Sequence, residues 1–297
     1  MTFQAFMATF PDETACRQFL ADRRWPKGVT CPRCGKPDNV YQLKTRRFTW
    51  ECSNKECRKG NAFRFSVTAG TIFADTKVPI VTWFKVLYTM LQAKKGISSL
   101  QIRRMYFGER SSTHTAWYVC HRLRAGMREP EFRQLMGIVE VDEAFVGGKE
   151  KNKHLGKRNP HNTAGKGKAI VIGAIERKGN VVCKMIANAD RPTMMGFVRE
   201  MVSQKVTLVA TDEHRGYDTI ADGGMPHGVV KHGDGQYVVG AIHTNTIESF
   251  WSLLKRGVMG SYHHVSEKYL PLYLNEFAFR FNHRKDEDIF GKAIAGC

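Results

Sequence analysis

The spacing of apolar residues divides the chain into a first half that predicts helices and a second half that predicts strands joined by helices. Over residues 79–128, apolar residues recur every three or four positions, which is the period of an α-helix that packs by one face. The pattern breaks near Gly108, and Ser111 or Ser112 can cap the helix that follows. Residues 11–24 have the same period and predict one more helix.

Short apolar runs bounded by polar residues predict strands in the second half of the chain. The predicted strands are 137–146, 168–176, 180–188, 205–212 and 228–232, and the predicted helices are 191–202, 244–256 and 266–283. This order predicts a mixed α/β domain. Between the first two strands, residues 149–168 are rich in Lys and Arg and poor in apolar residues, which predicts a basic loop.

Four of the eight cysteines cluster in two pairs, Cys31 with Cys34 and Cys52 with Cys57. Four thiolates at about 2.3 Å from the metal close a tetrahedral zinc site. A module this small buries little surface, so metal binding supplies its folding energy. The pattern therefore predicts a structural zinc ribbon over residues 28–74, with a redox dithiol as the alternative.

The chain is strongly basic, with 46 Lys and Arg against 28 Asp and Glu and a net charge of +18. That excess favours a phosphate backbone as the partner, although a merely basic soluble protein remains the alternative. The sequence has no uncharged apolar stretch of transmembrane length, and its first residues lack the basic start of a signal peptide. We therefore expect a cytoplasmic protein without a membrane partner, associated with the nucleoid when bound to DNA.

Residues 97–127 have the order of a helix-turn-helix, in which a short helix, a turn with glycine and a longer helix follow one another. Any small helical bundle shows similar periodicity, so a plain structural role is the alternative. The side chains expected to contact DNA are Lys44, Arg46 and Arg47 between the cysteine pairs, Arg103, Arg104, Tyr118, His121 and Arg122 in the helical segment, and Arg256 further along.

Two aspartates stand at the ends of apolar strand-like runs, Asp142 and Asp212, and Glu248 follows on a predicted helix. Lys255 lies seven residues after Glu248 and therefore on the same helical face. Three convergent acids repel one another unless cations are present, and carboxylates suit two magnesium or manganese ions. Asn245 lies about one turn before Glu248 and is a second candidate for the third ligand.

Each of these acids also has an ordinary structural interpretation. Glu140, Glu143 and Glu213 lie beside the two aspartates and are compatible with plain surface positions. A lone aspartate at a strand end is structural more often than catalytic. The prediction of a metal site therefore depends on the three acids together, with 35 residues between the second and third and a lysine seven positions later.

At these residues the chain resembles the bacterial insertion-sequence DDE transposases, in particular the ISXO-like group with an N-terminal zinc ribbon. The matching stretches are 24–35, 65–73, 95–99, 141–148, 211–217, 243–252 and 277–284, so that the resemblance covers nearly the whole chain. It implies an RNase H-like catalytic domain, binding to terminal inverted repeats, and metal-dependent cleavage and strand transfer by a homo-oligomer on DNA ends.

The resemblance assigns the first two metal-binding acids to Asp142 and Asp212. Some members of the group have an asparagine in place of the third acid, so this role stays open between Glu248 and Asn245. Glu248 is favoured because Lys255 stands seven residues after it.

These patterns together predict a multidomain α+β protein. It comprises an N-terminal helix at 1–27, a zinc ribbon at 28–74, a helix-turn-helix-like DNA-binding domain at 75–130 and an RNase H-like DDE transposase domain at 136–290. The predicted function is a DNA transposase with structural zinc and catalytic magnesium or manganese. A non-catalytic DNA-binding regulator is one alternative, but it leaves the acids without a role. A host RNase H-like nuclease or resolvase is the other, and it needs no recognition of inverted repeats.

Overall fold

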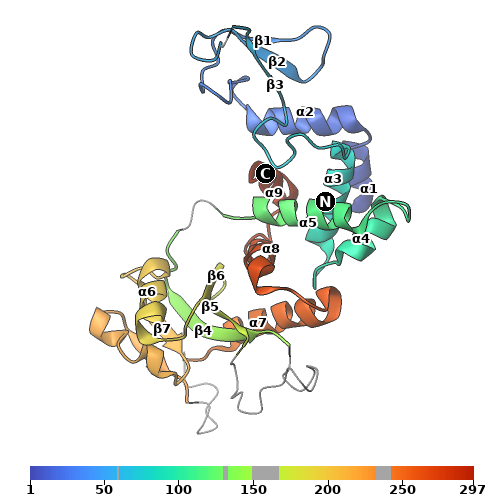
Figure 1. Cartoon of the computed structure of the whole chain (residues 1–297). Helices are drawn as coiled ribbons and strands as arrows, with labels where there is room; N and C mark the ends of the chain where they lie inside the picture. Colours follow the sequence, from blue (N-terminus) through green and yellow to red (C-terminus); the bar gives the residue numbers. More distant parts are fainter. Residues whose placement is uncertain (59, 130–132, 149–166, 232–241) are drawn as a thin grey trace. The chain divides into compact units, whose positions relative to one another are not determined.

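The computed structural model describes two compact units. The described residues are 1–58, 60–129, 133–148, 167–231 and 242–297. The first unit comprises Met1–Arg128 and Asp286–Cys297, and the second comprises Glu129–Lys285 (Figure 1). Within these residues no helix has both the length and the apolar character needed to cross a membrane. The predicted basic loop at 149–168 lies almost entirely outside them.

The first unit carries a small antiparallel sheet on a group of helices. Its strands are β1 (Val40–Gln42), β2 (Thr49–Cys52) and β3 (Phe63–Ser66), in the order β1-β2-β3. Its helices are α1 (Phe3–Thr9), α2 (Glu13–Arg24), α3 (Ile80–Gln92), α4 (Ser99–Tyr106), α5 (Thr113–Gly126) and α9 (Ile289–Ala295). The predicted helices at 11–24 and within 79–128 are therefore present, and the Ser112 side chain caps α5 by accepting from His114 N at 3.1 Å.

Aromatic packing accounts for two features of the first unit that the sequence analysis did not foresee. Helix α1 was not predicted as a separate helix, since the N-terminal segment at 1–27 was expected to have one helix at 11–24, and Phe6 within α1 is fully buried. The ring of Phe290 in α9 lies 5.6 Å from that of Phe6, 5.2 Å from Phe10 and 5.3 Å from Phe84. The C-terminal segment therefore belongs to the first unit, whereas the sequence analysis placed residues 286–290 with the catalytic domain.

The second unit is built on a five-stranded mixed sheet. Its strands are β4 (Ile138–Val146), β5 (Ala169–Glu176), β6 (Val181–Ile186), β7 (Leu208–Thr211) and β8 (His227–Val229), in the order β6-β5-β4-β7-β8. Strands β4, β5 and β6 form an antiparallel meander, while β7 is parallel to β4 and β8 is parallel to β7. All five predicted strands are present, with ends shifted by a few residues.

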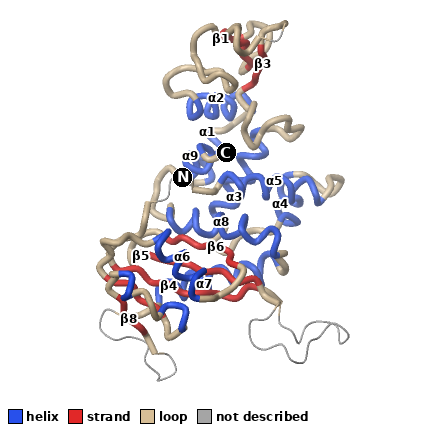
Figure 2. Tube along the Cα trace, turned by 60° about the vertical axis from the view of Figure 1, so that its left-hand side comes forward, coloured by secondary structure: helices blue, strands red, loops and turns tan. Residues whose placement is uncertain are grey.

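The helices of the second unit pack on both faces of this sheet (Figure 2). The helices are α6 (Arg191–Met201), α7 (Asn245–Gly257) and α8 (Leu270–Asn282), with short turns η3 (Arg215–Tyr217), η4 (Ala221–Gly223) and η7 (Glu267–Tyr269) and a π-helix η6 (Val258–Tyr262). The predicted helix at 266–283 thus begins as a 3-10 turn before α8.

Successive side chains of β4 point to opposite faces of the sheet and therefore contact different helices. Val139 and Val141 pack in one core with α6, whereas Ala144 and Val146 pack in another with α7 and α8. Because successive side chains of a strand point to opposite faces, the α7 face of β4 also carries the side chains two and four positions before Ala144. These are Asp142 and Glu140.

Candidate metal centres and DNA-contact residues

The four clustered cysteines converge on one point in the first unit. Their sulfur atoms lie within 4.8 Å of one another. Cys31 Sγ lies 3.7 Å from Cys57 Sγ, and Cys34 Sγ lies 3.9 Å from Cys52 Sγ. A tetrahedral site with zinc–sulfur bonds of about 2.3 Å has sulfur–sulfur edges of about 3.8 Å. The donor set therefore fits a structural zinc ion.

Backbone and amide groups hold these thiols in place. Gly35 adopts a left-handed conformation with φ of 71°, and its N–H donates to the carbonyl of Cys31 at 2.8 Å. Asn54 Nδ2 donates to Cys34 Sγ at 3.4 Å. The backbone N–H of Lys36, together with Asn54, lowers the pKa of Cys34 to about 6. Hydrogen bonds of this kind favour the thiolate, which is the form that binds metal.

Replacing one cysteine of each pair should remove the zinc. Purified wild-type protein should carry about one zinc per chain, because four cysteines form one site. We expect Cys31→Ser with Cys52→Ser to carry close to none, as measured by mass spectrometry of the metal content. Cys183→Ser, which lies outside the cluster, serves as the control and should keep its zinc. Full zinc content in the double variant would contradict the assignment.

The two predicted catalytic aspartates meet in the second unit. Strands β4 and β7 run parallel and pair Glu140 with Ala210. Asp142 and Asp212 each follow that pair by two residues, so they stand side by side where β7 ends. Oxygen atoms of Asp142, Asp212 and Glu143 lie within 4.8 Å of one another. The sheet therefore brings together the predicted pair and adds a third carboxylate beside it.

Glu143 reaches this group from the opposite face of β4, and its side chain is only 8% exposed. The hydroxyl of Tyr217 donates to Glu143 Oε2 at 3.0 Å, and His214 Nε2 lies 4.0 Å from Glu143 Oε1. The backbone N–H of His214 also donates to Asp212 Oδ1 at 3.1 Å. The η3 turn thus orients two of the carboxylates. The sequence analysis gave Glu143 no role, because nothing in the local pattern separates it from a surface acid.

Burial and mutual repulsion hold these acids in an unfavourable state. Burial, and then the charges of Glu143, Asp212 and, to a smaller extent, Glu248, together raise the pKa of Asp142 from 3.8 to about 7. Burial and then the charge of Asp212 likewise raise the pKa of Glu143. Such a site gains from a bound divalent cation, which offsets the repulsion and favours the ionised carboxylates.

The raised pKa of Asp142 makes stability without metal depend on pH. The folded protein binds more protons than the unfolded chain between about pH 4 and pH 7, so its stability falls as pH rises through that window. In EDTA at pH 8, Asp142→Asn should therefore melt at least about 2–4 °C above wild type, the shift that about 1 kcal/mol produces. We expect the difference to shrink towards pH 4 in differential scanning fluorimetry. Asp222→Asn at an exposed site is the control, and a lower melting temperature for Asp142→Asn would refute the prediction.

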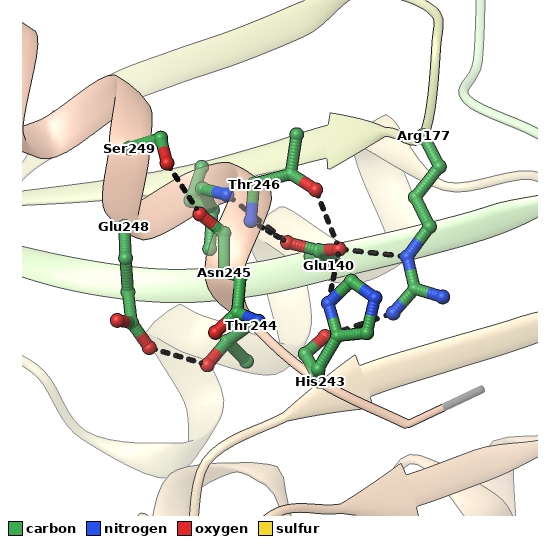
Figure 3. Close-up of polar contacts among 9 residues, drawn as sticks. Glu140, Arg177, His243, Thr244, Asn245, Thr246, Glu248 and Ser249 are labelled. Atoms are coloured by element: carbon green, nitrogen blue, oxygen red, sulfur yellow. Dashed lines mark hydrogen bonds and ion pairs between the residues drawn. The ribbon is translucent and has the colours of Figure 1, made fainter. Parts of the chain in front are cut away.

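The two candidates for the third ligand lie in the first turns of α7. Glu248 lies near enough to Asp142 to raise its pKa, but it does not join the group of three oxygens within 4.8 Å. Its Oε1 accepts from Thr244 Oγ1 at 2.7 Å (Figure 3). Asn245 is the first residue of α7 and is exposed. Lys255 is exposed in the last turn of the same helix.

The charge of the side chain should determine whether Glu248 or Asn245 is the more important metal ligand. A carboxylate contributes a full charge to a divalent ion, whereas an amide contributes only a dipole. We expect Glu248→Gln to lower strand transfer more than Asn245→Ala does, with magnesium and again with manganese. If Glu248→Gln stays near wild type in both metals while Asn245→Ala is inactive, the ligand is Asn245. Ser252→Ala, exposed on the same helix, is the control.

Glu140 holds the start of α7 against the sheet and is itself fully buried. The capping position of α7, Thr244, provides no side-chain cap. Glu140 from β4 replaces it: Glu140 Oε2 accepts from Thr246 N at 2.7 Å and from Ile247 N at 3.0 Å, and Oε1 accepts from Thr246 Oγ1 at 2.8 Å (Figure 3). A carboxylate at a helix N-terminus satisfies free N–H groups and complements the helix dipole.

An arginine pairs with the charge of Glu140, and a histidine ring lies beside the same carboxylate oxygen. Arg177 Nε donates to Glu140 Oε1 at 2.7 Å, and His243 Nδ1 lies 3.2 Å from the same oxygen. Arg177 also donates to the carbonyl of His243 at 3.0 Å, which fixes the chain just before α7 (Figure 3). The sequence analysis regarded Glu140 as compatible with the surface, and the structure corrects this. Its partners lie far away in the sequence, so no local pattern marks it.

A glycine beside Asp142 lets α7 approach the sheet closely. Gly173 of β5 is the register partner of Asp142. A Cβ atom at Gly173 would lie 2.7 Å from two ring atoms of Trp251 and 3.2 Å from the side chain of Ile247, both in α7. The close approach and the Glu140 contacts together place the first turns of α7 beside the aspartates.

The structure exposes most of the side chains predicted to contact DNA. Lys44, Arg46 and Arg47 are exposed in the turn between β1 and β2. Four more predicted contact residues are at least partly exposed: Arg104 in α4, Tyr118 and Arg122 in α5, and Arg256 in α7. Arg122 donates to the hydroxyl of Tyr118, so the two form one surface unit.

Two of the predicted contact residues have structural partners instead. His121 is only 7% exposed, and its ring stacks on Trp117 with centroids 3.9 Å apart. One helical turn separates the two residues, and the larger ring covers the smaller, so His121 does not face solvent as predicted. Arg103 is half-buried and donates to Ser111 O at 3.4 Å and to Thr113 Oγ1 at 3.2 Å, which ties α4 to the start of α5.

Comparison with known proteins identifies two family domains in the chain. Residues 134–282 match the model of the ISXO2-like transposase domain, and residues 11–60 match that of the transposase zinc-ribbon domain. The chain is 29% identical over 285 residues to an uncharacterised protein in transposable element ISH50 of Halobacterium salinarum, covering 92% of each chain.

A chain of the simian T-cell lymphotropic virus intasome in complex with PP2A regulatory subunit B56 gamma is 12% identical, with 58% of this chain and 63% of that chain covered. Its TM-score of 0.29 does not define a shared fold. The two domain models, by contrast, each span one of these side-chain clusters, the four cysteines in one case and the carboxylates in the other. The chain belongs to the ISXO2-like family of insertion-sequence transposases.

Proposed function

We propose that the protein binds the terminal inverted repeats of an insertion sequence, cleaves the element at its 3′ ends and joins those ends to target DNA. The observation that carries this proposal is the meeting of Asp142, in the middle of β4, with Asp212, at the end of the parallel strand β7, where burial and neighbouring carboxylates raise the pKa of Asp142 to about 7. Partly buried carboxylates so arranged are suited to hold divalent cations rather than to remain as bare charges.

Different residues of the site would have different roles in phosphoryl transfer. Asp142 and Asp212, with Glu248 or Asn245, would hold two magnesium or manganese ions, and Glu143 lies close enough to add a fourth carboxylate. When bound, the ions supply the Lewis acidity that phosphodiester chemistry needs. Lys255, which is exposed in the last turn of α7, would bind a DNA phosphate.

Two chemical steps follow from the proposal. Water attacks the phosphorus at the end of the element, the bond to the 3′-oxygen breaks, and this oxygen leaves as a hydroxyl that carries a proton. The freed 3′-hydroxyl then attacks a phosphorus of target DNA, and the 3′-oxygen of the target strand departs. The protein contributes position and charge complementarity to both steps.

Other features support the finer parts of this proposal. The second unit, with an antiparallel meander followed by two parallel strands, is compatible with an RNase H-like catalytic domain. Helices α4 and α5, joined by a short turn, suit a helix-turn-helix that reads the inverted repeat. The exposed cations of the β1–β2 turn suit a phosphate backbone. We propose further that the protein acts as a homo-oligomer that holds two DNA ends.

A cleavage assay on DNA flanking the gene tests the proposal. Labelled fragments carrying the short inverted repeats should be bound in preference to unrelated DNA, and should be cut at the 3′ end of the repeat when magnesium or manganese is added. A DNA-binding regulator would bind the repeat without cutting it. A host nuclease would cut unrelated DNA equally well. Either outcome would overturn the proposal.

A further inference from the structure

A pocket of about 520 Å³ lies in the second unit between the end of β4 and the segment that follows α7. Its volume falls in the range of roughly 300–1,000 Å³ that is usual for ligand sites. Phe145 lines it from β4, Lys168 from the residue before β5, and Lys255 from the last turn of α7. Val258 and Met259 line it from the π-helix η6.

The chemistry of this lining combines apolar surface with positive charge. Phe145 is 37% exposed and Met259 is 67% exposed, although both are large apolar side chains. Lys168 and Lys255 supply cations, and no acidic side chain is present among the described residues that line the pocket. Apolar contacts for a flat ring beside cations for a phosphate are what a nucleotide in a single strand requires. An apolar segment of another protein chain would gain nothing from the two lysines.

The backbone of the pocket wall is also unusual. The π-helix η6 continues directly from α7, and such helices are found frequently at functional sites. His263, which ends η6 and lines the pocket, has φ of 60°, a conformation that costs energy for a residue with a side chain. The buried carboxylate of Glu276 accepts from the hydroxyl of Tyr262 at 3.2 Å with each of its oxygens. The wall is therefore anchored in a strained conformation.

The pocket lies within a few nucleotides of the catalytic acids. Val146, which also lines the pocket, follows Asp142 by four residues on the same face of the extended strand, which span about 13 Å. Lys255 follows Glu248 by seven helical residues, which span about 10 Å. Successive nucleotides of a stacked DNA strand are about 3.4 Å apart along the helix axis. A strand whose phosphate lies at the acids can thus place a base in the pocket about three or four positions away.

We propose that this pocket holds one unpaired base of the DNA strand at the element end, with its phosphate bound by Lys168 and Lys255. The base leaves the duplex and packs against Phe145, Val258 and Met259. Its capture fixes the position of the strand relative to Asp142 and so selects which phosphate is cleaved. The inference rests on the proposed function, because it needs DNA at the acids.

A scan with 2-aminopurine tests this proposal on the full-length protein. This fluorescent base is substituted one position at a time along the last nucleotides of an end-containing duplex, with calcium in place of magnesium to prevent cleavage. We expect a rise of roughly several-fold at one position, because the fluorescence of this base increases when it leaves the stack. Met259→Ser should reduce that rise at least about two-fold while changing affinity for the duplex by less than about three-fold. Met259 is exposed, so this variant should fold normally.

Control variants distinguish base capture in the pocket from a protein–protein contact and from failure of the proposed function. Phe3→Ser, which changes an exposed apolar residue in α1, should leave the signal unchanged, while Phe145→Ala should lower it as Met259→Ser does. Two results would overturn base capture in the pocket without affecting the proposed function. In the first, 2-aminopurine fluorescence rises at no position although the duplex is bound and cut; in the second, the fluorescence rise persists in both pocket variants. A change in oligomeric state in those variants, with the signal intact, also overturns it and identifies a protein contact. Failure to bind or cut the repeat at all overturns the pocket and the proposed function together.

Discussion

Asp142→Asn and Asp212→Asn should each lower the rates of cleavage and strand transfer by about 10³-fold or more while leaving binding to end-containing DNA intact. Each substitution removes one charge from a group of carboxylates that lie within 4.8 Å of one another, and the divalent ions depend on that charge. Asparagine has nearly the volume of aspartate, so the sheet should remain folded. Less negative charge at the site should hold DNA affinity steady or raise it slightly.

The measurement pairs end cleavage with end binding on the same preparations. Asp218→Asn is the matched control, because Asp218 is an exposed aspartate of the second unit that pairs with Arg191. It should keep both properties. Either aspartate variant retaining activity within about ten-fold of wild type would contradict the account, as would loss of DNA binding in both.

Glu140→Ala should lower both the stability of the protein and its catalytic rate. Removing one member of a buried ion pair costs about 3–5 kcal/mol, because Arg177 is left with an uncompensated charge. For a domain of this size that cost corresponds to a melting temperature lower by roughly 6–20 °C. The first turn of α7 also loses its cap, so Glu248 and Asn245 lose their fixed position beside Asp142.

Glu140→Gln separates the positioning role from stability. The amide has the same shape but carries no charge for Arg177, and one of its two polar atoms can only donate. We expect this variant to melt closer to wild type, to bind DNA normally, and to need a higher manganese concentration for half-maximal activity. Glu200→Gln, an exposed glutamate paired with Lys184, should change none of these. An unchanged manganese requirement in an active Glu140→Gln protein would show that Glu140 is merely structural.

The local sequence pattern was sufficient to predict the helices and strands whose apolar residues recur with a fixed period. The strands of the second unit and helices α2, α3 and α6 follow from their apolar spacing, and Ser112 marks the start of α5. The convergence of Asp142 with Asp212 was also predicted from their apolar runs, which become the neighbouring strands β4 and β7, although Asp142 lies in the middle of β4 rather than at its end. The paired spacing of the cysteines likewise predicts their cluster.

Features that depend on distant partners could not be predicted in this way. Helix α1 is short, and Phe6 is buried by rings that include Phe290 near the other end of the chain. Glu140 bonds to Thr246, 106 positions away, and nothing around Glu140 distinguishes it from an exposed glutamate. His121 lies next to the buried stripe of α5, where helical spacing alone does not decide exposure. In each case a tertiary contact overrides a local pattern.

Strand transfer of a precut end is the most direct test of the proposed function. A labelled oligonucleotide that ends at the 3′-hydroxyl of the inverted repeat is incubated with the full-length protein, magnesium or manganese, and a supercoiled plasmid. The account predicts that label is joined covalently to the plasmid by wild-type protein and not by Asp142→Asn. Binding of the oligonucleotide without joining, or cutting of repeat and unrelated DNA alike without joining, would contradict it.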